Sequence, residues 1–342
     1  MTIPKDRSEN MIGSTIQTAA RDTTAETVGG PGGASSAQPG ASNTSGGTIV
    51  FDDIHRGYER GVDVLRGVTF ATAPGEVVGL LGKNGAGKTT LIRVAMGLIA
   101  PQTGSVRIRG LDPRVHPVEV KRQVGYVAED QILPPFLKVR ELMDLYRELY
   151  PSWDEKLATG LRDRFGLPSG AKIGRLSKGQ ARQAALLCAV SHRPRILILD
   201  EPAGGLDPAA RREFLETSIQ LLNEAGSTIL FSSHYMNDVE RMAARVVLLH
   251  DGRILIDRPL DDLRENHAVA LIPRDTPVDR QRILQLEGCL GLRERPEAIH
   301  AVFGCDPGTA QSMLARELDL ASVHCRSVAL EEMFIELVGG QS

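Results

Sequence analysis

A glycine-rich stretch with a lysine and two threonines is the first segment whose residue types and spacing suggest chemistry. It reads GKNGAGKTT over residues 82–90. Glycines allow a backbone to wrap a phosphate chain with its N–H groups pointing inward. We expect Lys88 to hold the β- and γ-phosphates of a nucleoside triphosphate and Thr89 to place its hydroxyl on Mg²⁺. The predicted nucleotide-binding residues here are Gly82, Lys83, Asn84, Gly85, Ala86, Gly87, Lys88, Thr89 and Thr90.

Two adjacent carboxylates are the second candidate for chemistry. They end the segment RILILDEP, residues 195–202, after four consecutive apolar residues. Such a run predicts a buried parallel strand, and ligands of open α/β sheets bind at the edge where such strands end. We expect Asp200 to reach Mg²⁺, directly or through water, and Glu201 to polarise the water that attacks the γ-phosphate. The alternative is an ordinary strand end with a solvated acidic pair.

Local patterns predict the elements that position these residues. A buried strand over residues 76–81 precedes the glycine-rich stretch, and the helical pattern TLIRVAMGLI follows it. A phosphate-binding loop requires this context, which disfavours the alternative of a glycine-rich turn with a solvent-facing lysine. Short apolar pieces from Thr48 onward predict further strands, and the leucine spacing over residues 138–166 predicts helices.

Composition limits the class of protein. The chain has 342 residues, 42% hydrophobic and 24% charged, which is typical of a soluble globular protein. Its net charge of −3 gives no reason to expect a nucleic-acid partner. No apolar run approaches the roughly 18 residues of a membrane-spanning helix.

The two ends of the chain differ from its middle. Residues 1–47 contain no Leu, Phe, Tyr or Trp and predict a disordered tail rich in Gly, Ser, Ala and Pro. Residues 265–342 alternate strand-like and helical pieces, and they predict a small α+β domain for dimer contacts or regulation. The main domain is expected over residues 48–264.

Five stretches in a fixed order resemble the ATP-binding cassette of ABC transporters. They are the glycine-rich loop, LSKGQ at residues 176–180, ILILDEP, GGLDP at residues 204–208, and the segment that begins ILFSSH. The resemblance implies an α/β P-loop NTPase fold of the ABC ATPase type. This fold has a mixed sheet core, an antiparallel β subdomain and an α-helical lobe, here about residues 130–190, to which the C-terminal α+β appendage is added.

The resemblance gives LSKGQ a role that its residue types alone do not suggest. In this family the signature motif of one subunit meets the γ-phosphate of ATP held by the other subunit, and a helix N-terminus suits an anion. Many members have Gly where Lys178 stands. Ser177, Gly179 and Gln180 match the motif, and these three together with Lys178 are the residues expected to contact ATP of the other subunit.

Further site residues are implied by single matches to the family. His234 matches the switch histidine, which with Glu201 forms the catalytic pair, and Asp207 matches the acidic residue of the D-loop. Tyr58 matches the aromatic residue that stacks on adenine. Glu129 stands where most members have a Gln that touches Mg²⁺ and the membrane subunit, and Gln131 follows two positions later.

The function that the resemblance implies is an ATPase subunit that binds MgATP as a homodimer or heterodimer. It would power export through a separate membrane permease, from the cytoplasmic face of the cell membrane. The alternative is a soluble ABC ATPase that acts on ribosomes or DNA, but the chain lacks the second cassette or the long coiled-coil and zinc-bearing insertions of such proteins. A degenerate regulator would lack catalytic residues, whereas Glu201 and His234 are present.

Overall fold

The computed structural model describes residues 47–59, 61–130, 133–206, 208–328 and 330–338. Three predictions concern residues outside these ranges. They are the disordered tail, of which only Gly47 is described, Asp207, and the alternative residue Gln131.

A six-stranded sheet, in the order β5-β6-β7-β3-β8-β9, forms the centre of the main domain. The first five strands are parallel and β9 runs antiparallel to β8. Every residue of β6 and β7 is buried, because both faces of the sheet are covered. The strands are β3 (Val77–Leu81), β5 (Val124–Val127), β6 (Ile196–Leu199), β7 (Thr228–Ser233), β8 (Arg245–His250) and β9 (Arg253–Pro259).

A second, antiparallel sheet has the order β2-β1-β4. Phe51 and Phe70 lie opposite each other in the first two strands and stack with their ring centroids 4.7 Å apart. Phe51 shares a buried cluster with Val78 and Leu80 of the central sheet, so one face of that sheet packs on this one. The elements on this side are β1 (Ile49–Glu59), β2 (Val62–Thr72), β4 (Thr103–Ile108), α1 (Lys88–Ala95) and α2 (Pro117–Gln123).

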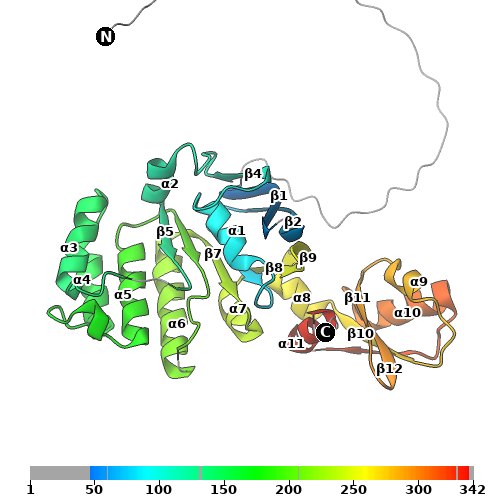
Figure 1. Ribbon diagram of the computed structural model, residues 1–342. Coiled ribbons are helices and arrows are strands. Elements are labelled where there is room, and N and C mark those ends of the chain that lie inside the picture. Colours follow the sequence, from blue (N-terminus) through cyan, green and yellow to red (C-terminus); the bar gives the residue numbers. More distant parts are fainter. Residues whose placement is uncertain (1–46, 60, 131–132, 207, 329, 339–342) are drawn as a thin grey trace, which may run out of the picture. The chain divides into compact units, whose positions relative to one another are not determined.

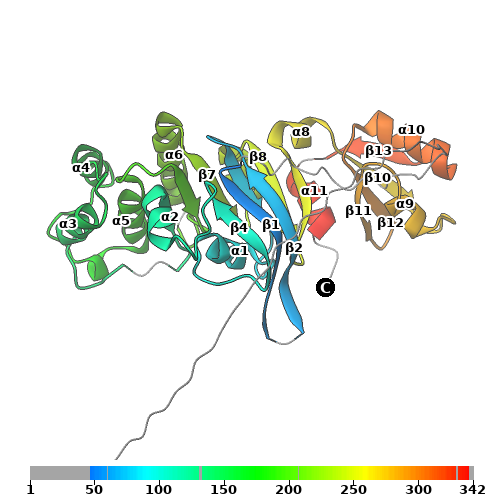
Figure 2. The same ribbon diagram turned by 90° about the horizontal axis from the view of Figure 1, so that it is seen from above.

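Helices cover the other face of the central sheet. Strand β7 shows the division, since Ile229 and Phe231 belong to the cluster with the helices and Leu230 to the cluster with the antiparallel sheet. Three of the helices lie together in both views (Figure 1 and Figure 2). The helices on this face are α3 (Val139–Leu149), α4 (Glu155–Arg164), α5 (Lys178–Val190), α6 (Pro208–Ala225) and α7 (Met236–Met242); the three that lie together are α3, α4 and α5.

The C-terminal part contains an antiparallel sheet in the order β11-β12-β10-β13. Its last helix returns to the main domain, because Leu330 and Met333 belong to the same buried cluster as the helices of the central sheet. Helix α8 (Leu260–Glu265) leads into this part, and its Leu260 and Leu263 belong to the cluster of the main domain. The elements that follow are β10 (Ala268–Pro273), α9 (Arg280–Leu284), β11 (Cys289–Glu294), β12 (Ala298–Phe303), α10 (Pro307–Leu318), β13 (His324–Ser327) and α11 (Leu330–Val338).

The predicted fold class is confirmed: a mixed sheet, an antiparallel sheet, a group of helices and an α+β C-terminal part are all present. The domain boundaries at residues 47/48 and 264/265 stay predictions. Within the described ranges, no helix combines the length and the apolar character needed to cross a membrane.

Candidate nucleotide site

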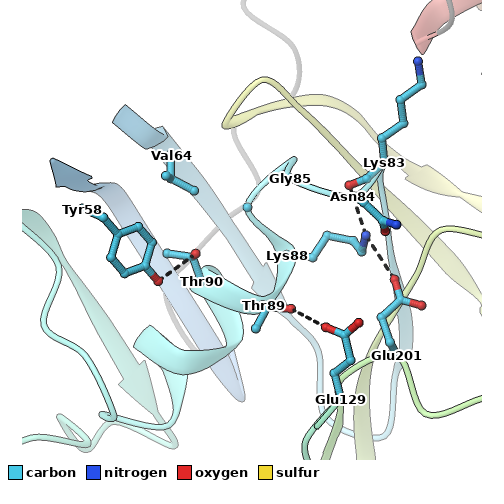
Figure 3. Close-up of a pocket in the computed structure, with 11 residues that line it drawn as sticks. Tyr58, Val64, Lys83, Asn84, Gly85, Lys88, Thr89, Thr90, Glu129 and Glu201 are labelled. Atoms are coloured by element: carbon cyan, nitrogen blue, oxygen red, sulfur yellow. Dashed lines mark hydrogen bonds and ion pairs between the residues drawn. The ribbon is translucent and has the colours of Figure 1, made fainter. Parts of the chain in front are cut away.

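The glycine-rich stretch forms a loop between β3 and α1 (Figure 3). Lys88 is the first residue of α1, and its Nζ donates hydrogen bonds to the carbonyl oxygens of Gly82 at 2.7 Å and Lys83 at 3.2 Å. Gly87 caps the helix with φ 107°, and a Cβ there would lie 2.8 Å from Cδ2 of Leu65, so only glycine fits. The loop therefore curls around the ammonium group that was predicted to meet phosphate.

Glu201 lies between Lys88 and His234. Its Oε1 is 3.1 Å from Nζ of Lys88, and its Oε2 is 2.8 Å from Nδ1 of His234. Glu201 is only 5% exposed, and its backbone has φ 45°, a left-handed conformation that costs on the order of 1–3 kcal/mol and persists only where neighbours hold it. Three residues predicted from distant parts of the sequence thus form one contact group.

Oxygen atoms of Thr89, Asp200 and Glu129 meet beside the loop. The hydroxyl of Thr89 lies 3.2 Å from Oδ1 of Asp200 and 3.4 Å from Oε2 of Glu129. Burial raises the pKa of Asp200 and the charges of Glu129 and Glu201 add to the rise, while hydrogen bonds from Ser232 and Thr89 oppose it. Oδ2 of Asp200 is buried and accepts no hydrogen bond from the described residues.

These oxygen atoms suit a Mg²⁺ ion that is shared with substrate phosphates, and they do not form a site that encloses a metal by protein ligands alone. Mg²⁺ prefers hard oxygen ligands and is usually bound by one or two carboxylates together with substrate phosphates. The described residues contain no cluster of three or more His, Cys, Asp or Glu side chains that could enclose a metal. An unpartnered carboxylate oxygen beside a threonine hydroxyl is the donor set that such a shared site needs.

A pocket of about 510 Å³ opens over the loop. Tyr58 lines it with 55% of its surface exposed, and its hydroxyl lies 3.1 Å from Oγ1 of Thr90, on the opposite side of the loop from Glu201 (Figure 3). The remaining lining residues come from the loop and its surroundings: Val64, Lys83, Asn84, Gly85, Gly87, Lys88, Thr89, Glu129 and Glu201.

The signature residues lie at the start of α5. Ser177 is the N-cap: its Oγ accepts a hydrogen bond from the N–H of Gln180 at 3.1 Å, and its own N–H donates to Oε1 of Gln180 at 3.1 Å. This reciprocal pair is a capping box that fixes the helix start. All four signature residues line a second pocket of about 530 Å³, which shares no lining residue with the first. Within one chain, then, the signature and the phosphate loop face different spaces.

Comparisons with known proteins decide the family. The sequence profile of the ABC transporter family matches residues 65–204. The ABC transporter ATP-binding protein YtrB of Bacillus subtilis (strain 168) is 30% identical over 281 residues, which cover 82% of this chain and 95% of YtrB. The chain belongs to the ATP-binding proteins of ABC transporters.

Other ABC transporter proteins extend the match. Nod factor export ATP-binding protein I of Paraburkholderia xenovorans (strain LB400) is 32% identical over 309 residues, or 85% of this chain and 97% of that protein. A solved structure of the ATP-binding subunit of an ABC transporter matches with a TM-score of 0.58 and 33% sequence identity. The match covers 64% of this chain and 92% of the solved chain. A solved dimeric ATP-binding cassette in a post-hydrolysis state, bound to ADP and Pi, matches with a TM-score of 0.56 and 23% sequence identity. The match covers 62% of this chain and 98% of the solved chain, and it shows the fold alone.

The predicted function is confirmed at the level of the family. As an ABC transporter ATP-binding subunit, the chain binds and hydrolyses ATP and powers a separate membrane permease. The relatives do not favour the alternative of an ATPase that acts on ribosomes or DNA.

Two residues of this ABC ATPase site were missed from the sequence. Ser232 donates to Oδ1 of Asp200 at 2.7 Å and accepts from the N–H of Glu201 at 2.8 Å. Arg182 donates to the carbonyl oxygens of Glu201 and Glu129. Ser232 and Ser233 are polar residues that follow an apolar run just before His234, which was a usable signal. Arg182 on its helix resembles any surface arginine.

Proposed function

We propose that Glu201 is the general base of ATP hydrolysis and that His234 orients it and contacts the γ-phosphate. The observation that carries this proposal is the contact of both carboxylate oxygens of Glu201, one with Lys88 and one with His234. A γ-phosphate bound by Lys88 would lie next to Glu201, within reach of a water that the carboxylate can deprotonate. His234 would keep the carboxylate turned toward that water.

The rest of the phosphate loop would bind the nucleotide. Backbone N–H groups of the loop and the start of α1 attract the phosphates, and the ring of Tyr58 offers a surface on which adenine can stack. The half-exposed position of Tyr58 on the pocket wall supports this role. The loop residues assigned to ATP are Gly82, Lys83, Asn84, Gly85, Ala86, Gly87, Lys88, Thr89 and Thr90.

Mg²⁺ would be held by Thr89, Asp200 and Glu129 together with phosphate oxygens. The free, buried Oδ2 of Asp200 supports this assignment, and when bound the ion would neutralise charge that develops on the phosphates. Ser232 would keep Asp200 pointed at the ion through its hydrogen bond. Glu129 supplies a carboxylate where the family has an amide, which adds negative charge next to the metal.

A complete site would need two chains. Ser177, Lys178, Gly179 and Gln180 line a space separate from the phosphate loop of their own chain, so they are placed to meet ATP held by a second cassette, a homodimer or heterodimer partner. Asp207, in the adjacent D-loop, is assigned to the same interface although it lies outside the described residues.

The permease partner would place the chain on the cytoplasmic face of the cell membrane. Export is the favoured direction, because a relative that matches 85% of this chain is named for Nod factor export. Glu129 belongs to the loop that joins the two lobes. We assign this loop to contact with the permease.

Glu201→Gln tests the proposed function. The amide keeps the size and the polarity of the side chain but cannot accept a proton, so ATP hydrolysis should slow by about a hundredfold or more. Binding of ATP should persist, and the variant should accumulate as an ATP-bound dimer in size-exclusion chromatography. A rate of phosphate release equal to that of the wild type would exclude Glu201 as the base.

A further inference from the structure

Arg182 connects the signature helix to the two segments that carry carboxylates in the nucleotide site. It lies one turn after the capping box of α5, and its side chain is half-buried. Nη1 donates a hydrogen bond to the carbonyl oxygen of Glu201 at 2.6 Å, and Nη2 donates to the carbonyl oxygen of Glu129 at 2.7 Å. One guanidinium group therefore joins three segments that are far apart in the sequence.

The peptide of Glu201 is held on both sides. Its N–H is bound by Ser232, and its carbonyl oxygen accepts hydrogen bonds from Arg182 and from the N–H of Gly204 at 3.0 Å. These contacts matter because the left-handed backbone of Glu201, at φ 45°, persists only where neighbours fix it. Of the groups that hold this peptide, only Arg182 comes from the signature helix.

Four carboxylates surround the half-buried guanidinium of Arg182. Burial lowers the pKa of the guanidinium, and the charges of Glu129, Asp130, Glu201 and Asp200 oppose that shift and stabilise its positive charge. The planar fork of arginine can donate to two separate carbonyl groups at once, and a lysine in its place cannot reproduce that geometry.

We propose that Arg182 is a positioning residue that makes the orientation of Glu201 depend on the placement of the signature helix. This inference rests on the proposed roles of Glu201 and of the signature. The start of α5 would contact ATP on the partner chain, while Arg182 on the same helix holds the peptide of the base that acts on the chain's own ATP. Closure around one nucleotide would thereby align the base for the other, and the two sites of a dimer would work cooperatively.

The test compares three variants of the full chain in steady-state hydrolysis of MgATP. Arg182→Gln should lower kcat by about tenfold or more, because it removes a charged donor from two carbonyl groups. The Kd for ADP, measured by calorimetry, should stay within about twofold, since Arg182 does not line the pocket. The Hill coefficient for ATP should lie above 1 in the wild type and fall toward 1 in the variant. The kcat and the Hill coefficient of Arg182→Lys should lie between those of the wild type and those of Arg182→Gln. Arg140→Gln, which removes an exposed arginine of α3, should match the wild type in both.

Each possible result supports or overturns the inference. An unchanged kcat overturns it, as does a Hill coefficient of 1 in the wild type. A lower kcat with an unchanged Hill coefficient would show local support of Glu201 without coupling, which also overturns it. Glu201→Gln in the same assay separates this inference from the proposed function: if that variant is inactive while Arg182→Gln is fully active, only the inference fails.

Discussion

Lys88 is a cation with 5% of its side chain exposed, surrounded by carbonyl oxygens and one carboxylate. At the scale of single residues, this position supports its proposed role as the cation that neutralises phosphate from inside the loop. Lys88→Ala should weaken binding of ATP and ADP by about a hundredfold or more, the scale of a lost charge-assisted contact in a buried site. Isothermal titration calorimetry measures this change directly.

A matched control for this prediction is Lys121→Ala, which removes an exposed lysine of α2. Its nucleotide affinity should equal that of the wild type. An unchanged nucleotide affinity of Lys88→Ala would exclude the assignment of residues 82–90 to phosphate binding.

Asp200 is a single residue whose buried carboxylate is proposed to bind Mg²⁺ but lowers the stability of the fold. Because burial raises its pKa above the ordinary 3.8, the native state without metal binds the proton more tightly than the unfolded chain does. The free energy of unfolding should therefore decrease as pH rises from that ordinary value through the raised native pKa. Asp200→Asn should remove this decrease and raise the Tm of the nucleotide-free protein at neutral pH by about 2–4 °C, while abolishing Mg²⁺-dependent hydrolysis.

Thermal unfolding across a pH series without Mg²⁺ checks this prediction. Asp52→Asn, at an exposed position of β1, should leave both the Tm and its pH dependence unchanged. A lower Tm for Asp200→Asn would mean that the hydrogen bonds of this carboxylate outweigh the cost of burying it.

At the scale of elements, an ion pair joins α6 to α7. Nε of Arg211 donates to Oδ1 of Asp238 at 2.9 Å, a second bond joins the same two side chains, and the guanidinium lies 3.8 Å from the ring centroid of Tyr235. Asp238 is 7% exposed, so removing its partner leaves a buried charge. Arg211→Met should lower the free energy of unfolding by about 3 kcal/mol.

The double variant Arg211→Met with Asp238→Leu should recover most of that loss, because a matched apolar pair leaves no uncompensated charge. Arg212→Met, at the exposed neighbouring position, should unfold at the same urea concentration as the wild type. Equal losses in the single and the double variant would show that α6 and α7 depend on the ion pair itself.

The comparison of sequence and structure also belongs to the scale of elements. The strand, loop and helix around Lys88 were predictable because a continuous stretch of residues determines them. The contacts of Arg182 were not, because Nη2 reaches a carbonyl 53 positions away and no local pattern records that approach. The strand order β11-β12-β10-β13 was likewise hidden, since a strand's apolar pattern does not identify its neighbours.

At the scale of the whole molecule, the phosphate loop and the signature residues of one chain line separate pockets. Two copies related by a twofold axis would pair each phosphate loop with the other copy's signature. Gly179→Asp should then stop hydrolysis, because its carboxylate would repel the γ-phosphate held by the partner, while nucleotide binding persists. A Cβ at Gly179 would meet nothing closer than 3.7 Å, so the isolated chain can accommodate the substitution.

Mixing two inactive variants tests this pairing. A dimer of one Gly179→Asp chain and one Lys88→Ala chain contains one site with an intact phosphate loop and an intact signature, so partial ATPase activity should appear. Exchange of subunits is verified by a tag pull-down. If exchange occurs without activity, a covalently linked dimer with one intact site distinguishes a signature that acts within its own chain from two sites that must act together.

The ion pair between Lys88 and Glu201 gives the buried lysine a counter-ion from its own chain. A buried lysine without a partner is costly, and the carboxylate of Glu201 supplies the opposite charge. If Lys88 binds the γ-phosphate as proposed, arrival of ATP would be an exchange of anions, in which phosphate takes the place of the carboxylate beside Nζ. The same exchange would release the carboxylate that is proposed to deprotonate water, so the base would become available only when its substrate is in place. Departure of phosphate would reverse the exchange and leave the lysine neutralised for the next turnover.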